Sequence, residues 1–171
     1  TTSKNRKWKN LEESYLIKYF LRSLIKSVNF KQTYRIYLVI DSDDNFFCEE
    51  NFEDICIVLN IKIIKIINKS VRKGHLTKLW NIAFKKAYND YCDYFFQCGD
   101  DIEFMTKDWI DDSIKILNEN NEIGITGPLD LGRLNIDYEN RPGGNRFIQT
   151  QTFVSRKHME IFGFFFPEEI K

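Results

Sequence analysis

The stretch Tyr94-Phe95-Phe96-Gln97-Cys98-Gly99-Asp100-Asp101 restricts the fold and the chemistry of this chain more than any other. The mainly apolar run predicts a buried strand, and two adjacent carboxylates follow it almost at once. Neighbouring carboxylates at the end of a buried strand repel each other and lose solvation, so they need compensation. A divalent cation is the usual compensation, and Mg²⁺ or Mn²⁺ prefers such hard oxygen ligands. The alternative is an ordinary turn with solvated acids.

A second acidic turn, Asp41-Ser42-Asp43-Asp44, follows the predicted strand 35–40. In a sheet with helices on both faces, ligands bind at the carboxyl ends of the strands. If the two strands are near neighbours, both acidic turns line one crevice. The negative charge of the two acidic turns would repel a phosphorylated ligand unless a metal ion bridged the carboxylates and the phosphates. A nucleotide diphosphate bound with Mn²⁺ or Mg²⁺ meets that requirement.

Helical and strand patterns alternate along the chain, which indicates an α/β class. Asn10 and Glu13 have capping-box spacing, and a helical face of apolar residues follows them. That face comprises Ile17, Phe20, Leu21, Leu24 and Val28. The other expected elements are a short helix within 49–60, strand 61–67, a helix with Leu76, Leu79, Trp80, Ala83 and Ala87 on one face, strand 94–98, a helix from an N-cap at Thr106 to about Glu119, strand 123–126, a long loop over 129–146, strand 147–154 and a short helix over 156–162.

Composition favours one domain spanning residues 1–171, with 43% hydrophobic and 15% aromatic residues to fill a core. Lys and Arg number 25, as do Asp and Glu, so no basic excess points to nucleic acid. No apolar stretch is long enough to cross a bilayer, and no signal-peptide pattern opens the chain. The four cysteines lack CxxC spacing and fit buried free thiols, which suggests a cytoplasmic or other intracellular compartment. The sequence also looks cut at both ends.

Basic residues surround Gly74 just before the predicted third helix: Arg72, Lys73, His75 and Lys78. A glycine beside basic groups at a helix start can receive a phosphate through backbone N–H groups. An ordinary surface loop is an equally good reading of this segment. His75 has no partner at metal-ligand spacing, and His158 reads as a packed or surface side chain. No Gly-x-Gly-x-x-Gly, Walker-type or Gly-x-Ser-x-Gly motif is present.

The order of these motifs resembles that of nucleotide-sugar glycosyltransferases with the GT-A fold, closest to family 2-like sequences. The similarity rests on five segments in the same order. They are the Asp-rich turn 41–44, the helix 74–87 that begins with a glycine, Gly99-Asp100-Asp101 in place of the Asp-x-Asp motif, the segment 122–128, and the segment 153–165 with its Gly-Phe turn. It covers most of the chain from Leu11 to Lys171. The resemblance implies a mixed, mainly parallel sheet flanked by helices, a nucleotide-sugar donor, UDP-sugar above all, and Mn²⁺ or Mg²⁺.

The resemblance also implies roles for particular residues. Asp101 would be the main metal ligand, and Asp100 would bind the metal or contact the donor. Asp41 and Asp43 would face the base and ribose. The other residues expected beside the nucleotide are Gly74, His75 and Lys78. The acceptor, a glycan or a protein, is open, and the loop 129–146 would form the acceptor side or a lid.

The chain departs from the family pattern in three places. Gly99 replaces the first Asp of the metal motif, the family's first strand should precede Thr1, and the family's general base would lie near the end of this chain. Glu168 and Glu169 are candidates for that base by position alone, so the catalytic base is unknown. Two alternatives therefore remain, a sugar nucleotidyltransferase and a catalytically inactive GT-A-like binding module.

Overall fold

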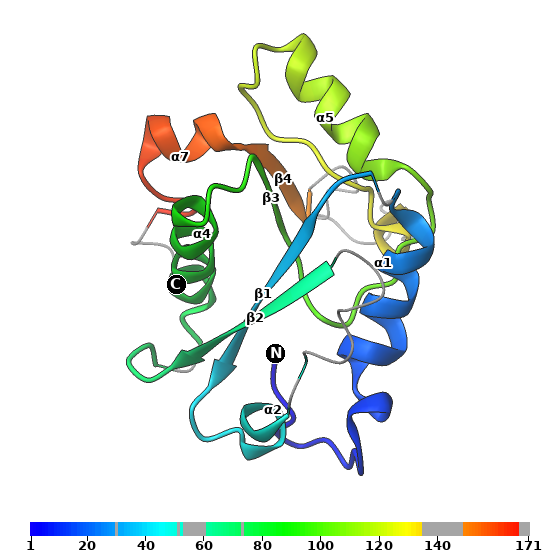
Figure 1. The fold of residues 1–171 in the computed structure, drawn as a ribbon, viewed down its shortest axis with the longest axis vertical. Coiled ribbons are helices and arrows are strands. Elements are labelled where there is room, and N and C mark those ends of the chain that lie inside the picture. Colours follow the sequence, from blue (N-terminus) through cyan, green and yellow to red (C-terminus); the bar gives the residue numbers. More distant parts are fainter. Residues whose placement is uncertain (30, 51, 53–60, 73, 135–148, 168–171) are drawn as a thin grey trace, which may run out of the picture.

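The computed structural model describes residues 1–171 except 30, 51, 53–60, 73, 135–148 and 168–171 (Figure 1). It is a mixed α/β structure. Its elements in chain order are η1 (Leu11–Glu13), η2 (Leu16–Leu21), α1 (Arg22–Ser27), β1 (Tyr34–Asp41), α2 (Asn45–Glu49), β2 (Ile61–Asn68), α4 (Leu76–Asn89), β3 (Tyr94–Gln97), α5 (Trp109–Glu119), α6 (Leu131–Leu134), β4 (Thr152–Ser155) and α7 (Arg156–Phe162).

The strands β1 and β2 form a parallel pair. Their register runs from Tyr34 opposite Ile61 to Asp41 opposite Asn68. The β-branched residues that fill β2 favour this extended conformation. The predicted strands 35–40 and 61–67 are confirmed, and the parallel register brings two polar side chains to the same carboxyl end.

The strands β3 and β4 form an antiparallel pair in which Phe96 lies opposite Phe153. Thr126 adds an isolated bridge to Phe153 on the other side of β4. Within the described part of the chain, these strands and the β1–β2 pair make two separate two-stranded sheets. The α/β class is therefore established, while the single mixed sheet of a GT-A fold remains an expectation.

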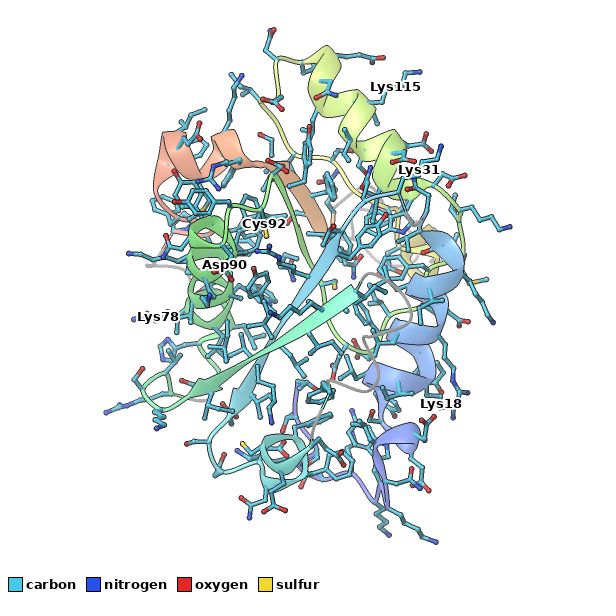
Figure 2. All side chains as sticks on the ribbon, in the orientation of Figure 1. Lys18, Lys31, Lys78, Asp90, Cys92 and Lys115 are labelled. Carbon is cyan, nitrogen blue, oxygen red and sulfur yellow. The ribbon has the colours of Figure 1, made fainter. Side chains whose placement is uncertain are left out.

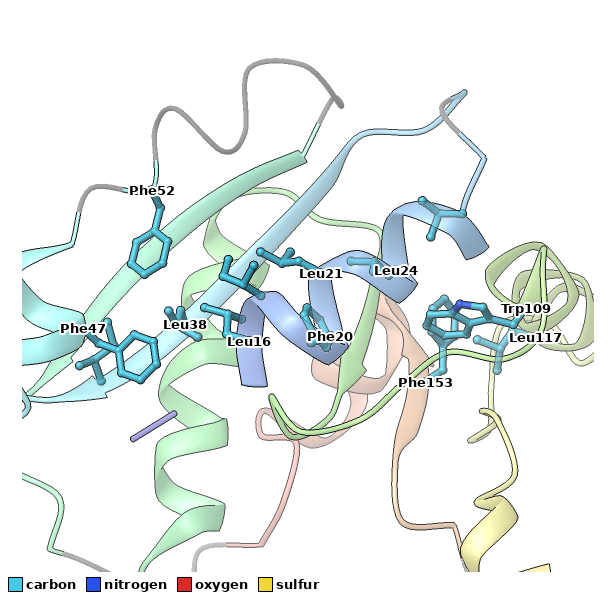
Figure 3. Packing of buried hydrophobic residues seen from close by; sticks show 13 residues of the cluster. Leu16, Phe20, Leu21, Leu24, Leu38, Phe47, Phe52, Trp109, Leu117 and Phe153 are labelled. Atoms are coloured by element: carbon cyan, nitrogen blue, oxygen red, sulfur yellow. The ribbon is translucent and has the colours of Figure 1, made fainter. Parts of the chain in front are cut away.

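The first helical segment supplies one wall of the core. Asn10 accepts a hydrogen bond from Glu13 N, and the Glu13 carboxylate accepts one from Lys9 N at 2.9 Å. A π-helical stretch, η2, then leads into α1. All five residues of the predicted apolar face are buried: Ile17, Phe20, Leu21, Leu24 and Val28. Figure 3 shows three of them, Phe20, Leu21 and Leu24, in the same cluster as Leu38 of β1.

Trp109 connects four elements at the centre of the larger core cluster. Its indole stacks on Phe104 at 4.8 Å between ring centroids and contacts Phe96 at 4.6 Å. Phe153 meets the indole edge at 6.1 Å (Figure 3). The indole N–H donates to Ser27 Oγ at 3.2 Å, so its polar atom is satisfied. Trp109 therefore holds α1, β3, β4 and α5 together.

A second core cluster joins α4 and α7 to the β3–β4 pair. Phe84 of α4 stacks on Phe165 with ring centroids 3.7 Å apart. Asn81, one turn earlier, accepts hydrogen bonds from the backbone N–H groups of Phe165 and Phe166 and donates to Phe166 O. These bonds fix the turn after α7 against α4, whose helical pattern the sequence predicts.

Helix α5 begins three residues after the predicted N-cap at Thr106. Asp108 precedes Trp109 with a φ of +57°, a left-handed conformation that a continuous helix cannot include. The Asp108 N–H instead donates to Ser27 O at 2.9 Å. The prediction of the N-cap was therefore wrong, because a contact with α1 and the burial of Trp109 decide where the helix starts.

The predicted strand 123–126 is also wrong, apart from the bridge at Thr126. Asn121, Glu122 and Gly124 have positive φ values, so the backbone turns instead of pairing. Ile123 and Ile125 are exposed as a result.

Other boundaries differ as well. The strand predicted over 147–154 is β4, restricted to Thr152–Ser155, and residues 147 and 148 lie outside the described residues. The predicted loop 129–146 contains α6, and its part from 135 onward is not described. Helix α2, which the sequence did not predict, starts after an Asp44 cap. The helix proposed within 49–60 lies almost wholly outside the described part.

No helix among the described residues is long and apolar enough to cross a membrane. Three cysteines in the described part, Cys48, Cys92 and Cys98, are free thiols, but they are half-buried where the sequence predicts buried thiols.

Removing the Trp109 side chain should destabilise the fold strongly. We expect Trp109→Ala to lower the free energy of unfolding by about 3–5 kcal/mol, because it opens a cavity between four elements. The exposed neighbour Ile116 of α5 provides a matched control, and Ile116→Ala should cost less than about 1 kcal/mol. Urea denaturation measures both. Equal losses for the two variants would contradict the central role of Trp109.

Candidate functional site

The carboxyl ends of β1 and β3 open into one cavity of about 1290 Å³. Asp41 at the end of β1 and Gly99 with Asp100 after β3 all line it, as does Gly74 ahead of α4. Each of the two acidic turns expected to share a crevice thus contributes one aspartate to this cavity, Asp41 or Asp100. This arrangement follows from strand direction, because both strands deliver their carboxyl ends to the same side (Figure 1).

Asn68 fixes the carboxylate of Asp41. Its Nδ2 donates to Asp41 Oδ1 at 2.9 Å and to Val71 O at 2.9 Å. Its Oδ1 accepts from the N–H groups of Ser70 and Val71. Asn68 is buried, and all of these bonds hold its amide in one orientation. Sequence reasoning missed this residue, although its place at the end of the strand paired with β1 is a usable signal.

Lys4 supplies positive charge to the first acidic turn. Its ammonium lies 2.7 Å from Asp43 Oδ1 and 3.5 Å from Asp41 Oδ2. The hydrogen bond from Lys4 lowers the pKa of Asp43, and the bond to Asp43 raises the pKa of Lys4. Part of the compensation that the sequence assigns to a metal ion is thus provided by the chain itself.

Thr1 connects the two acidic turns. Its hydroxyl donates to Asp100 Oδ2, while its ammonium donates to Val39 O of β1 at 2.9 Å. Together with the ion pairs of Lys4, these bonds draw residues 1–4 across the carboxyl ends of both strands. The short segment was not predicted to belong to the site, because contacts between residues so far apart in sequence leave no local pattern.

Asp44 has a structural role beside the site. It is 2% exposed, caps α2 through Phe47 N at 3.4 Å, and accepts from both Ser3 N and Ser3 Oγ at 2.6 and 2.7 Å. Burial raises the pKa of this carboxyl, but the hydrogen bonds from Ser3 and from Phe47 N outweigh it, so the pKa is lowered overall. Asp44 therefore remains ionised and anchors residues 1–4 to the end of β1.

Gly99 leaves room for the side chain of Asp101. A Cβ placed on Gly99 would lie 2.6 Å from Asp101 Oδ1, well inside van der Waals contact. The Asp101 carboxylate therefore folds back over the glycine and remains exposed to solvent. Gly99 thus determines where the Asp101 carboxylate can lie.

Of the residues predicted to bind the nucleotide around Gly74, only Gly74 itself lines the same cavity as Asp41 and Asp100. Gly74 has a φ of +93°, which favours glycine, and it lines the cavity. His75 precedes the first residue of α4, and its Nδ1 is buried without a hydrogen-bond partner in the structure. Figure 2 shows Lys78 at the outer edge of the molecule beside α4. Neither His75 nor Lys78, nor the predicted ligands Asp43 and Asp101, is among the residues that line the cavity.

The donor set suits a hard cation shared with a phosphorylated ligand. Asp100 and Asp101 offer carboxylate oxygens, and in the described part no group of three or more His, Cys, Asp or Glu is arranged around a common point. Mg²⁺ is commonly bound through one or two carboxylates together with substrate phosphates and water. The two carboxylates fit that mode of binding, in which the nucleotide supplies the other oxygens.

Two other titratable groups near the core are unsuited to acid–base or nucleophilic chemistry. Burial, with the nearby charges of Asp100 and Asp101, raises the pKa of the Cys98 thiol to about 12, so the thiolate is absent at neutral pH. Burial lowers the pKa of His158, whose ring packs against Phe162 and Phe165. His158 is thus a packed histidine, as predicted, and Glu168 and Glu169 lie outside the described residues.

Comparison of the chain with protein-family models, with curated proteins and with solved structures finds no match. The function is therefore argued from the site alone.

Asp44 should make the stability of the fold sensitive to acid. Because the pKa of Asp44 is lowered in the folded state, its contribution is complete above the ordinary aspartate pKa and is lost as the pH falls through the folded value. Asp44→Asn keeps a capping oxygen but cannot titrate. We expect its free energy of unfolding to fall less than that of the wild type between about pH 5 and pH 2, measured by urea denaturation.

Ser3→Ala provides an independent check, because it removes the hydroxyl donor to Asp44 and should weaken the same acid dependence. Parallel pH profiles for the wild type and Asp44→Asn would show that Asp44 does not contribute to it.

Proposed function

We propose that this chain is a metal-dependent glycosyltransferase of the GT-A type, which transfers a sugar from a nucleotide-sugar donor to an acceptor hydroxyl. A UDP-sugar is the favoured donor. The observation that carries the proposal is that Asp41 and Asp100, from turns after two different strands, line one cavity at the carboxyl ends of those strands.

Two aspartates that line the cavity, Asp41 and Asp100, and two beside them that do not line it, Asp43 and Asp101, could divide the donor between them. Carboxylates such as Asp41 and Asp43 accept hydrogen bonds from ribose hydroxyls and from the N–H of a base. Asp100 and Asp101 would hold Mn²⁺ or Mg²⁺ at the diphosphate. A bound divalent cation neutralises the charge that develops on the leaving nucleotide diphosphate. Lys4, already beside Asp41 and Asp43, adds positive charge for the phosphates.

The position of Gly74 supports the same placement of the donor. Gly74 lines the cavity shortly before α4, at the point where a phosphate could meet backbone N–H groups. The general base that would take the proton of the acceptor hydroxyl is unassigned, since no carboxylate on the acceptor side is defined by the described residues.

The contacts of residues 1–4 favour a second candidate, a binding module without transferase activity. Thr1, Ser3 and Lys4 already provide partners for the acids, so these carboxylates are compensated without a metal ion. A sugar nucleotidyltransferase is a further alternative, and release of pyrophosphate from a nucleoside triphosphate and a sugar phosphate would identify it.

Thermal unfolding with UDP or GDP, each with and without Mn²⁺, tests the proposal. A ligand at a hundred times its dissociation constant stabilises by about 2.7 kcal/mol, which raises the Tm of a chain of this size by roughly 5–10 °C. We expect such a shift for the wild type only when UDP and Mn²⁺ are present together. Asp101→Asn should abolish the shift without changing the Tm of the free protein, because Asp101 is exposed.

Asp112→Asn on the exposed face of α5 is the matched control and should keep the full shift. The absence of a nucleotide-dependent shift in the wild type would contradict the donor site. Nucleotide binding without transfer to any acceptor would instead favour the binding module.

Gly99→Ala tests the placement of Asp101 by geometry alone. The added Cβ would displace the Asp101 carboxylate, the mobile end of an exposed side chain, so the free energy of unfolding should change by less than about 1 kcal/mol. The Kd for UDP with Mn²⁺ should rise roughly tenfold, because the displaced carboxylate no longer reaches the cation. A tenfold change in Kd corresponds to about 1.4 kcal/mol of binding free energy. Isothermal titration calorimetry measures the affinity.

Gly132→Ala in α6 is the control for Gly99→Ala. Its Cβ would also approach an aspartate oxygen, Asp130 Oδ1 at 3.1 Å, but Gly132 does not line the cavity. Unchanged affinity in Gly99→Ala would indicate that the position of Asp101 is unimportant for binding.

A further inference from the structure

A row of basic side chains lies on the outer side of the first helical segment. Lys18, Arg22 and Lys26 are spaced four residues apart along η2 and α1, and all three are exposed. Residues four apart are neighbours on the surface of a helix, so these side chains form one row. The opposite side of the same segment is buried in the core. The row therefore faces solvent, and Figure 2 shows Lys18 at the outer edge of the molecule.

The segment between the acidic turn after β3 and helix α5 lies beside this row. Phe104 N donates to Ser23 Oγ at 2.9 Å, and Asp108 N donates to Ser27 O at 2.9 Å. Each of these serines directly follows a member of the basic row, so the two bonds hold residues 104–108 against it. The helical segment and residues 103–107 together line a groove of about 430 Å³.

The side chains that line this groove are mainly cationic. Its charged residues are Lys18, Arg22, Lys26, Lys107 and the single acid Glu103. Arg22 pairs with Glu12 at 3.1 Å, whereas Lys26 and Lys107 have no ion-pair partner within the described part of the chain. Asp108 follows Lys107 but does not line the groove. On a chain with zero formal net charge, such a local excess of positive charge attracts an anionic surface.

Met105 indicates which kind of anionic surface fits. It lines the same groove as the cations, and it is 70% exposed. A nucleic-acid backbone offers an apolar thioether little to be buried against, whereas a lipid surface offers anionic headgroups and acyl chains together. Lysine stems also lie along apolar surface while their ammonium groups stay at the headgroups. Basic residues around an exposed apolar side chain are therefore typical of a protein that rests on an anionic bilayer.

We propose that the face formed by Lys18, Arg22, Lys26, Met105 and Lys107 binds the surface of an anionic membrane. Each basic residue near such a surface strengthens binding by roughly a factor of five, and burial of the Met105 side chain adds to it. The buried side of the helical segment stays in the core, so the contact is made by side chains and not by insertion of a helix. The proposal is independent of the proposed transferase activity, because none of these five residues lines the cavity of the acidic site.

Cosedimentation of the whole chain with lipid vesicles tests this proposal. We expect binding to vesicles of phosphatidylserine and phosphatidylcholine, none to phosphatidylcholine alone, and weaker binding as salt screens the charges. Lys26→Gln combined with Lys107→Gln should lower the partition coefficient roughly thirtyfold, and Glu103→Gln should raise it roughly fivefold. Met105→Gln should lower it without changing its dependence on salt. All four side chains are exposed, so the Tm of each variant should match that of the wild type.

Lys69→Gln combined with Lys85→Gln is the matched control. It removes the same charge from exposed positions directly after β2 and in α4, and α4 lies on the other side of the molecule from α1 (Figure 1). We expect this control to bind vesicles as the wild type does. Equal losses for the two pairs of substitutions, or equal binding to the two kinds of vesicle, would overturn the proposal. Binding of a DNA duplex in place of vesicles, lost with Lys26 and Lys107, would overturn it in favour of a nucleic-acid surface.

Discussion

The need to compensate carboxylates at the ends of strands organises one side of this molecule. Parallel strands bring Asp41 and the Gly99-Asp100-Asp101 turn to the same edge, where their charges repel one another. Three groups of the chain bind these carboxylates: the Asn68 amide, the Lys4 ammonium and the Thr1 hydroxyl. They come from two segments, residues 1–4 and the end of β2, so the position of both segments depends on this constraint.

The sequence predicted those elements whose patterns are local. The β-branched residues of 61–67 favour an extended backbone, and the helical spacing of Phe20, Leu21 and Leu24 indicates a buried helical face. The structure confirms the strand and the burial of that face. Prediction was wrong where a distant contact or the sign of φ decides. Helix α5 starts after Asp108 because the N–H of Asp108 donates to Ser27 O. The segment around Gly124 was predicted to be a strand, but positive φ values make its backbone turn.

The residues of the candidate site also include some that the sequence could predict and some that it could not. Asp41 and Asp100 could be brought together by reasoning from strand direction, since the carboxyl ends of parallel strands share an edge. Asn68 was missed although it ends the strand paired with β1, whereas Lys4 could not be predicted, because an ion pair across a long sequence separation leaves no periodic signal. His75 and Lys78 were predicted from their nearness to Gly74 in sequence, yet only Gly74 lines the cavity. The ring nitrogen Nδ1 of His75 is buried away from the cavity, and Lys78 lies at the outer edge of the molecule (Figure 2).

Thr1 links the acidic site to the edge of β1. One residue donates to Asp100 through its hydroxyl and to Val39 through its nitrogen, so the position of one contact constrains the other. A cation on Asp100 would compete with that hydroxyl for the same carboxylate oxygens. The proposed metal site and the observed position of Thr1 would therefore oppose each other at Asp100.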